Sequence, residues 1–221
     1  MNDYSFIFHS FQHRKIQNKV EGERVLKNNQ KPKYKQIIDA AVITIAENGY
    51  HQCQVSKIAK QAGVADGTIY LYFKNKEDIL ISLFKEKMQQ FIQNLSEIIA
   101  GKNTAAEKLL LLVENHFRIL SEDHALAIVT QLELRQTNKE LRLKINDILK
   151  GYLQLIDNIL EEGIQNGEFA PALDIRLTRQ MIFGTMDETA TNWVMNDHKY
   201  DLVSLAPKIH QLLIHGCGNH H

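Results

Sequence analysis

The sequence is poor in cysteine, proline and long apolar runs, and each shortage excludes a class of protein. Two cysteines and three prolines occur in 221 residues. The cysteines lie far apart, so a disulfide framework and a CxxC metal site are excluded and free thiols are expected. No apolar run approaches the roughly 18 residues that span a membrane. The first residues, MNDYSFIFHSFQHRK, do not match a signal peptide, so we expect a cytoplasmic protein.

Motifs of common enzymes are missing as well. The sequence contains no GxSxG nucleophile elbow, no phosphate-binding P-loop and no GxGxxG dinucleotide motif. Its ten histidines include no HExxH or ExxH pair of the kind that binds zinc or two irons in helical proteins. We therefore expect neither an enzyme nor a metal or cofactor site.

The distribution of charge is the first positive signal. The net charge of the whole chain is zero, but residues 1–87 carry 14 Lys and Arg against 9 Asp and Glu. Residues 88–221 carry 12 Lys and Arg against 17 Asp and Glu. The N-terminal part is therefore basic, as contact with nucleic-acid phosphates requires.

Residues 54–76, QVSKIAKQAGVADGTIYLYFKNK, indicate two short helices around a glycine turn. Apolar residues at helical spacing give the first helix one buried side, namely Val55, Ile58, Ala59 and Ala62. Gly63 suits the positive φ that ends such a helix. A second helix is expected over residues 65–73, and three residues share its outer side: Thr68, Leu71 and Tyr72. This is the pattern of a helix-turn-helix, whose second helix enters the major groove of DNA.

The same segment resembles the DNA-binding domain of the TetR family of bacterial transcriptional repressors. The residues that carry the resemblance are 46–50, 58–59, 62–64, 67–70, 72–73, 76 and 80. One departure is Ala65, which stands where the family often has a capping Ser or Thr. Asp66 is expected to cap the helix instead; its alternative role is to accept a hydrogen bond from a cytosine amino group.

The resemblance also implies which residues contact DNA. Phosphate contacts are implied for Gln54, Ser56, Tyr70, Tyr72 and Lys76, and close approach to the groove for Gly67. Base contacts are implied for Thr68, through its hydroxyl or methyl group, and for Leu71, against a thymine methyl. Tyr70 has an alternative role, which is to brace the three-helix head.

The expected fold is all-α, because no segment alternates with the period of a strand. About nine helices are predicted, at residues 33–48, 55–62, 65–73, 76–100, 105–121, 124–136, 138–165, 174–195 and 204–215. Three form an N-terminal head and six a body. We divide the chain into a disordered extension (1–30), a DNA-binding domain (31–78) and a ligand-binding and dimerisation domain (79–221). Residues 76–100 are predicted to be the only element that spans both domains.

In the resembled family, the last two long helices of each subunit form a four-helix dimer interface. Residues 180–194 and 204–215 fit that role, because they combine small residues with large apolar ones. The residues assigned to a homodimer interface are Gly184, Met186, Ala190, Trp193, Leu212 and Leu213. The alternative is that they form an ordinary core within one subunit.

Further matches narrow the resemblance to the fatty-acid-degradation regulators of this family, which leave DNA when they bind long-chain acyl-CoA. They include the runs VADGTIYLYFKNKEDILISLFKEKM, AIVTQLELRQ and GTMDETATNWVMND. The resemblance implies an apolar tunnel for the acyl chain, with walls from Leu112, Phe117, Leu120, Ile128, Leu132, Leu153 and Ile156. It also implies cations for the CoA phosphates, for which Arg135 is the first candidate, followed by Arg118, Arg142 and Arg179.

The sequence therefore predicts a homodimeric repressor that binds a palindromic operator and is released by long-chain acyl-CoA. Within the family, the alternative effector is another apolar molecule, such as an exported drug. Outside it, the alternative is a helical enzyme or interaction module that retains the head. The outward face of residues 68–72, together with Lys76, counts against that alternative.

Overall fold

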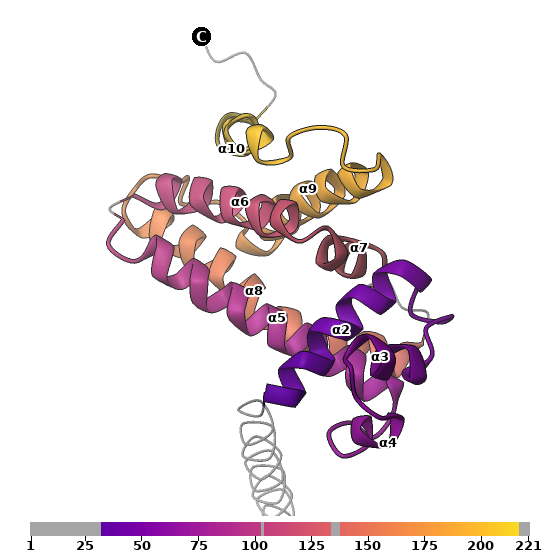
Figure 1. Ribbon diagram of the computed structural model, residues 1–221. Helices are drawn as coiled ribbons and strands as arrows, with labels where there is room; N and C mark the ends of the chain where they lie inside the picture. Colours follow the sequence, from indigo (N-terminus) through magenta and orange to yellow (C-terminus); the bar gives the residue numbers. More distant parts are fainter. Residues whose placement is uncertain (1–31, 103, 134–137, 217–221) are drawn as a thin grey trace, which may run out of the picture.

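The structure, a computed structural model, describes residues 32–102, 104–133 and 138–216. These residues form nine α-helices and one 3-10 helix and include no strand, which confirms the all-α prediction (Figure 1). The head consists of α2 (Pro32–Asn48), α3 (Val55–Gln61) and α4 (Asp66–Ile69). The body consists of α5 (Lys76–Ile99), α6 (Ala105–Glu122), α7 (His124–Glu133), α8 (Lys139–Gln165), α9 (Ile175–Met195), η1 (Val203–Leu205) and α10 (Ala206–His215). The predicted extension at residues 1–30 lies outside the described residues.

The core of the head is built from the apolar faces of α2, α3 and α4, and Ile37, Ile58 and Ile69 are fully buried in it. The first turns of α5 complete this core, and so do side chains from α7 and α8, including Leu126 and Ile145. The prediction that residues 76–100 alone span both parts is therefore wrong. The helix α6 returns towards the head, so α7 lies against α2 and α8 starts at the head (Figure 1).

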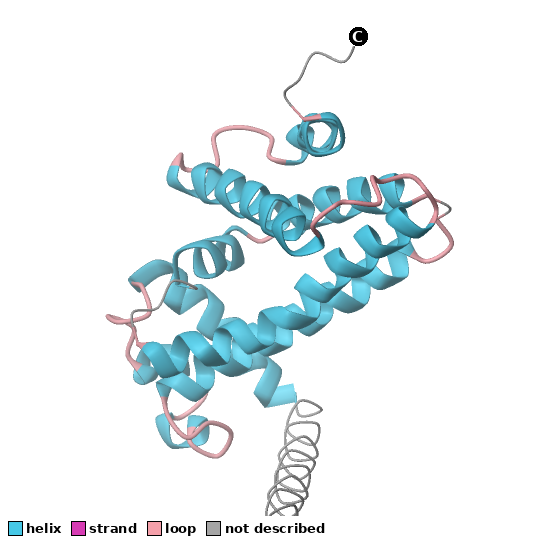
Figure 2. Ribbon diagram, turned by 180° about the vertical axis from the view of Figure 1, so that it is seen from behind, coloured by secondary structure: helices cyan, strands magenta, loops and turns pink. Residues whose placement is uncertain are grey.

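The body is a bundle in which α5 and α8 run side by side away from the head, and α6 and α9 return (Figure 2). The rings of Phe91 on α5 and Tyr152 on α8 lie 5.0 Å apart between centroids. Arg179 near the start of α9 pairs with Asp157 on α8. This arrangement encloses a second apolar core, distinct from the core of the head although α5, α7 and α8 supply residues to both.

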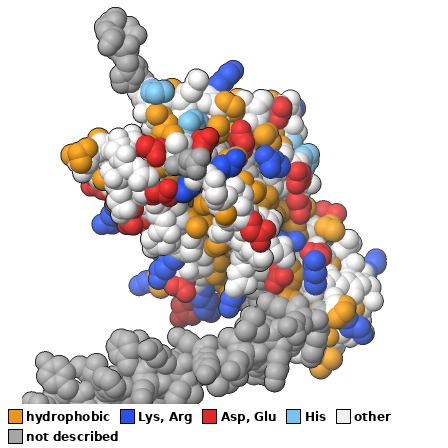
Figure 3. All heavy atoms as spheres, turned by 90° about the vertical axis from the view of Figure 1, so that its left-hand side faces the viewer, with side chains coloured by type: hydrophobic (Ala, Val, Ile, Leu, Met, Phe, Trp, Pro, Cys, Tyr) orange, Lys and Arg blue, Asp and Glu red, His pale blue; other side chains and the backbone are white. Residues whose placement is uncertain are grey.

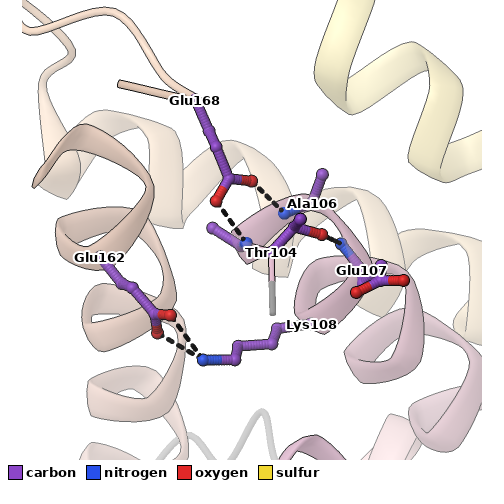
Figure 4. A network of polar contacts seen from close by, with 7 residues as sticks. Thr104, Ala106, Glu107, Lys108, Glu162 and Glu168 are labelled. Atoms are coloured by element: carbon purple, nitrogen blue, oxygen red, sulfur yellow. Dashed lines mark hydrogen bonds and ion pairs between the residues drawn. The ribbon is translucent and has the colours of Figure 1, made fainter. Parts of the chain in front are cut away.

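The end of the body away from the head is fixed by caps at the start of α6 (Figure 4). The Thr104 hydroxyl accepts a hydrogen bond from the Glu107 amide at 3.1 Å, as a helix N-cap should. The Glu168 carboxylate accepts from the amides of Ala105 and Ala106 at 3.0 and 3.1 Å. These two backbone hydrogen bonds lower the pKa of Glu168. A residue 63 positions after Ala105 therefore satisfies free amides at the helix start.

The recognition helix is shorter than predicted. The helix α4 ends at Ile69, and the chain then turns so that Phe73 packs against the ring of Tyr34, with centroids 5.2 Å apart. A helix continued to residue 73 is therefore wrong. The prediction that Asp66 caps this helix is also wrong, since the N-cap is Ala65 and no side-chain capping bond occurs there among the described residues. Asp66 is instead the first helical residue, where its charge favours the helix dipole.

Candidate DNA interface and ligand cavity

The outward face of the head is formed by α4 and the turn that follows it. Leu71 is 77% exposed and Tyr70 is 59% exposed, while Thr68 is half-buried and Gly67 exposed. A tyrosine so exposed does not brace the core of the head. A large apolar side chain exposed at the tip of the head is available for contact with another molecule.

An open hollow lies beside this face, between the starts of α3, α4 and α5. It has a volume of about 480 Å³. It brings together four of the residues to which phosphate contacts are assigned: Gln54, Ser56, Tyr70 and Lys76. Asp66 and His51 line the same hollow. Tyr72 is half-buried and contributes to the outward side of the core of the head rather than to the hollow's lining, within the described part of the chain.

Lys76 has a structural role in addition to its place in the hollow. Its Nζ donates to the carbonyl oxygens of Tyr50 and His51 at 2.9 and 3.1 Å. The same ammonium lies 4.7 Å from the centre of the Tyr50 ring. Two of the three donors of the ammonium are therefore used inside the head. Exposed Lys74, in the turn directly after the outward face, is a further cation close to this surface.

A cavity lies in the body and takes lining residues from five helices, α5 to α9. Its volume is about 70 Å³. Most of the lining is apolar, and the spacing of Phe84, Lys87, Met88 and Phe91 shows that α5 presents one continuous face to it. Lys87 was missed by the sequence reasoning, although this i, i+3, i+4, i+7 spacing could have found it. Its Nζ pairs with Asp39 of α2 at 2.9 Å.

One of the predicted tunnel walls lines this cavity in the structure. Leu120 lines it, whereas Phe117, Leu112 and Ile156 are fully buried in the core of the body. Phe117 follows His116, and adjacent residues of a helix point in different directions. Leu132 is 44% exposed on the outer side of α7. The lining does not include Ile128 or Leu153 among the described residues.

The predicted cations that the structure describes do not line this cavity. Arg135 is outside the described residues. Arg118 and Arg142 are exposed on α6 and α8. Arg179 is already paired with Asp157, so its charge is neutralised within the body. Lys87 is the one lysine or arginine that lines the cavity within the ranges that the structure describes.

Polar side chains gather at one end of the cavity. Nδ1 of His116 lies 3.1 Å from the hydroxyl of Tyr152, and their rings are stacked. Burial lowers the pKa of His116 to about 4, so its imidazole is neutral at pH 7. Burial also raises the pKa of Tyr152, with a further contribution from the charge of Asp187. The side-chain amide of Gln131 lies against Asp187. In the orientation that satisfies both groups, the amide nitrogen of Gln131 donates to Oδ1 of Asp187 at 3.2 Å.

Half of the residues assigned to a dimer interface are unavailable for it. Met186, Ala190 and Trp193 are buried within the core of the subunit, so their assignment to an interface is wrong. Their side of α9 faces α6 and α7, and the small residues serve packing inside one chain. Gly184 and Leu212 are exposed, and Leu213 is half-buried. The outer side of α9 instead exposes Leu177 and Met181.

The surface of the body is mixed in charge. Figure 3 shows acidic and basic side chains interspersed over one face of it. The described helices include none that is both long and apolar enough to cross a membrane. The same residues contain no group of three or more His, Cys, Asp or Glu side chains that could hold a metal ion.

Comparison with known proteins assigns both parts of the chain. Residues 37–83 match the family described as bacterial regulatory proteins, tetR family, and residues 84–216 match the YsiA-like protein C-terminal region. The fatty acid metabolism regulator protein of Bacillus subtilis is 70% identical over 189 residues, which are 86% of this chain and 97% of that protein. Because these relatives are transcriptional regulators, the prediction that the chain is not an enzyme is confirmed.

Two solved structures are similar along nearly the same length. FadR from Bacillus subtilis, in a crystal structure with stearoyl-CoA, has 70% identity and a TM-score of 0.83, and covers 84% of this chain and 100% of its own. The fatty acid degradation regulator FadR from Bacillus halodurans has 63% identity and a TM-score of 0.82, with the same coverage. The two family matches are contiguous and together cover residues 37–216, and a relative with 70% identity covers 86% of the chain. This chain therefore belongs to the TetR family of bacterial transcriptional regulators.

Proposed function

We propose that this protein is a cytoplasmic, homodimeric repressor of fatty-acid degradation genes. It binds a palindromic operator through the head and leaves it when the body binds long-chain acyl-CoA. The observation that carries this proposal is the position of the cavity, whose lining includes side chains that also belong to the core of the head. The complex of a 70% identical protein with stearoyl-CoA supports the class of effector.

Contact with DNA is proposed for the hollow and the outward face together. A phosphate group fits against Gln54, Ser56 and Tyr70 in the hollow. Thr68 and Leu71 then face the edges of the bases, and Tyr72 stands beside them. Two heads of a dimer read two half-sites on one side of the DNA, about 34–36 Å apart if they lie one helical turn from each other.

The coupling between the two ligands is proposed to run through a shared wall, formed by Phe84, Leu126 and Ile145. Each of these side chains lines the cavity and also belongs to the core of the head. The cavity has a volume of about 70 Å³, whereas ligand pockets usually enclose about 300–1,000 Å³. A long acyl chain must therefore displace lining side chains, and those of the shared wall move the head when they are displaced.

The end of α7 gives a second connection between cavity and head. Gln131 lines the cavity, and Glu133, half a turn further, accepts a hydrogen bond from the Tyr50 amide at 3.1 Å. Tyr50 lies in the turn before α3, which carries Gln54 and Ser56 to the hollow. A change in the position of α7 is therefore transmitted to the residues proposed to contact phosphates.

The CoA head group requires cations outside the apolar lining. Arg135, the first candidate from the sequence, lies outside the described residues, and exposed Arg118 on α6 is the next candidate. Arg142 is also exposed. Arg179 is the weakest of the four, because a phosphate would have to compete with Asp157 for it.

Titration of a labelled operator complex tests the effector. Palmitoyl- or stearoyl-CoA should release the protein from DNA, with a chain-length dependence of the order of 0.8 kcal/mol for each buried methylene. The free fatty acid should be much weaker, because it lacks the phosphates. Reciprocity requires operator DNA to weaken acyl-CoA binding by the same factor. Release by an apolar drug and not by any acyl-CoA would favour the alternative effector class.

A further inference from the structure

The polar end of the cavity holds one hydrogen-bonding atom that the protein leaves available. Nδ1 of His116 is bound to the Tyr152 hydroxyl at 3.1 Å. Nε2 of the same ring is shielded from solvent and has no hydrogen-bond partner among the residues that the structure describes. Because His116 lines the cavity, a molecule inside it is in position to supply that partner. An enclosed polar atom without a partner destabilises the protein, so a ligand that supplies the partner gains affinity.

The contact between His116 and Tyr152 fits two tautomers, and in one of them the phenol donates to Nδ1. The Tyr152 phenol stays protonated because burial raises its pKa, and it has a single proton to donate. Donation of that proton to Nδ1 leaves the imidazole proton on Nε2. In that tautomer the available atom is a neutral N–H donor, and the group that it binds is an oxygen acceptor.

We infer that Nε2–H of His116 donates to the thioester carbonyl of the bound acyl-CoA. This inference rests on the proposed function and deepens it, since it fixes which end of the ligand lies where. The carbonyl lies between α6, α8 and α9, and the acyl chain follows the apolar lining towards the head.

A neutral carbonyl fits this position better than a carboxylate does. Asp187 stands at the same end of the cavity and repels a second negative charge. The ammonium of Lys87 lies further towards the head and is bound to Asp39. A fatty-acid carboxylate would therefore lose its hydration without a cation in return. The cavity lining therefore favours the thioester over the free acid, in addition to the preference that comes from contacts with the CoA phosphates.

The direction of the acyl chain follows from the spacing of the lining residues. From Phe91 to Phe84 on α5, and from Tyr152 to Ile145 on α8, the lining extends over seven residues of helix, or about 10 Å. The far end of this path is the shared wall of Phe84, Leu126 and Ile145. A chain anchored at His116 must extend about 10 Å to reach the wall, so acyl-CoA with a shorter chain should bind without releasing DNA.

Comparison of two ligands that differ only in the carbonyl tests the inference. Stearoyl-CoA and S-octadecyl-CoA, its thioether, are titrated against the full-length protein and the His116→Leu variant. The wild type should prefer the thioester roughly three- to tenfold, the equivalent of one hydrogen bond, and the variant should bind both alike. The matched control His124→Leu, at an exposed histidine on α7, should keep the preference. Equal binding of the two ligands by the wild type overturns the inference, and so does an unchanged preference in His116→Leu.

An infrared measurement on the wild type keeps the test independent of the variant's folding. The stretch of a 13C-labelled thioester carbonyl should move to lower frequency in the complex than in a non-hydrogen-bonding solvent. A frequency equal to that in the apolar solvent contradicts the contact with His116. If the wild type binds neither ligand, the proposed effector itself is wrong, whereas loss of the carbonyl preference alone leaves the effector intact.

Discussion

Lys76 shows how one side chain can combine two roles that a sequence motif does not separate. Its ammonium donates to the carbonyl oxygens of Tyr50 and His51, and it also lines the hollow proposed to bind a phosphate. It therefore fastens the first turn of α5 to the turn after α2. The motif position indicates a cation near DNA, but the geometry shows that this cation also holds the head together.

Substitution of Lys76 should accordingly change stability as well as DNA binding. Lys76→Ala removes two hydrogen bonds from a charged donor, and the free energy of unfolding should fall by about 1–2 kcal/mol. Binding to all DNA sequences should weaken alike. Lys74→Ala, at an exposed lysine two residues earlier, should weaken binding and lower the salt dependence by about one phosphate contact without loss of stability. Thermal melts and anisotropy at several salt concentrations measure both; equal stability of the two variants would show that the Lys76 hydrogen bonds contribute little.

Thr68 should affect the sequence preference of binding rather than its overall strength. The side chain lies on α4 behind exposed Leu71, where its hydroxyl and methyl groups face a base edge in the proposed complex. Thr68→Ala should therefore reduce discrimination at particular base pairs by about 1–3 kcal/mol. A binding assay over operator variants measures this. A uniform loss over all variants, as expected for a phosphate contact, would contradict the assignment.

The elements of the fold were more predictable than the directions of single side chains. The long helices follow from apolar periodicity and from the caps Asn75, Thr104, Asn138 and Asp174, each of which accepts from a backbone amide. Successive side chains of a helix point in directions about 100° apart, so neighbouring residues can face a cavity, the core and solvent in turn. For this reason the sequence places Phe117 in the tunnel wall, whereas its neighbour His116 lines the cavity. In the same way it places Met186 at an interface, whereas Met186 is buried inside the subunit. Those distinctions depend on the packing of helices that are distant in sequence.

Gly163, in the last turns of α8, is required by the close approach of a side chain from the following turn. Phe169 folds back over it, and the amides of Glu168 and Phe169 both donate to its carbonyl oxygen at 2.8 and 3.0 Å. A Cβ at this position would overlap the ring of Phe169. Gly163→Ala should therefore destabilise the protein by about 1–3 kcal/mol, against the 0.5–1 kcal/mol that alanine contributes in an open helix. Chemical denaturation measures the change.

A second substitution shows whether the clash is the cause. In a double-mutant cycle, Phe169→Ala removes the ring, so Gly163→Ala should become neutral or stabilising in that background. If the cost of Gly163→Ala is the same with and without the ring, the close approach is not what destabilises the variant.

The cap on α6 makes part of the stability depend on pH. Hydrogen bonds from the amides of Ala105 and Ala106 lower the pKa of Glu168 in the folded protein below its ordinary value of 4.5. A group whose folded pKa is lowered binds its proton more readily when unfolded. Its contribution to stability is therefore complete above about pH 4.5 and is lost as pH falls through the folded pKa. Glu168→Gln should be less stable than wild type at pH 7, and the difference should shrink at acidic pH. A constant difference between pH 7 and pH 3 would show that the charge is not responsible.

At the scale of the whole molecule, the core of the head and the cavity of the body share side chains, so the two parts are not joined by one helix alone. Phe84, Leu126 and Ile145 belong to the core of the head and also line the cavity of the body. A close-packed wall does not deform continuously, so a ligand on one side changes the packing on the other. The sequence could not show this, because the three residues come from three helices that are brought together only by the return of α6.

The outer side of α9 should determine whether two molecules associate. Leu177 and Met181 are one turn apart and are 65% and 49% exposed, although both are large apolar residues. The double variant Leu177→Asp, Met181→Asp should be monomeric, because it introduces charges that the interface would have to bury without partners. Leu143→Asp, at an exposed leucine of α8, should keep the mass of a dimer. Light scattering measures the mass of each variant.

Loss of the dimer should weaken binding to the operator strongly, although the contacts of each head with its half-site are unchanged. Within a dimer, the second head binds its half-site at the high effective concentration that the first head provides, and a monomer loses that gain. The monomeric variant should therefore bind a full palindrome hardly better than a single half-site, while wild type prefers the palindrome by about 10²–10⁴-fold. The same variant should still bind acyl-CoA, since the cavity takes its lining from α5 to α9 of one chain. If the variant remains a dimer, or if it keeps the wild-type preference for a palindrome, the outer side of α9 is not the interface.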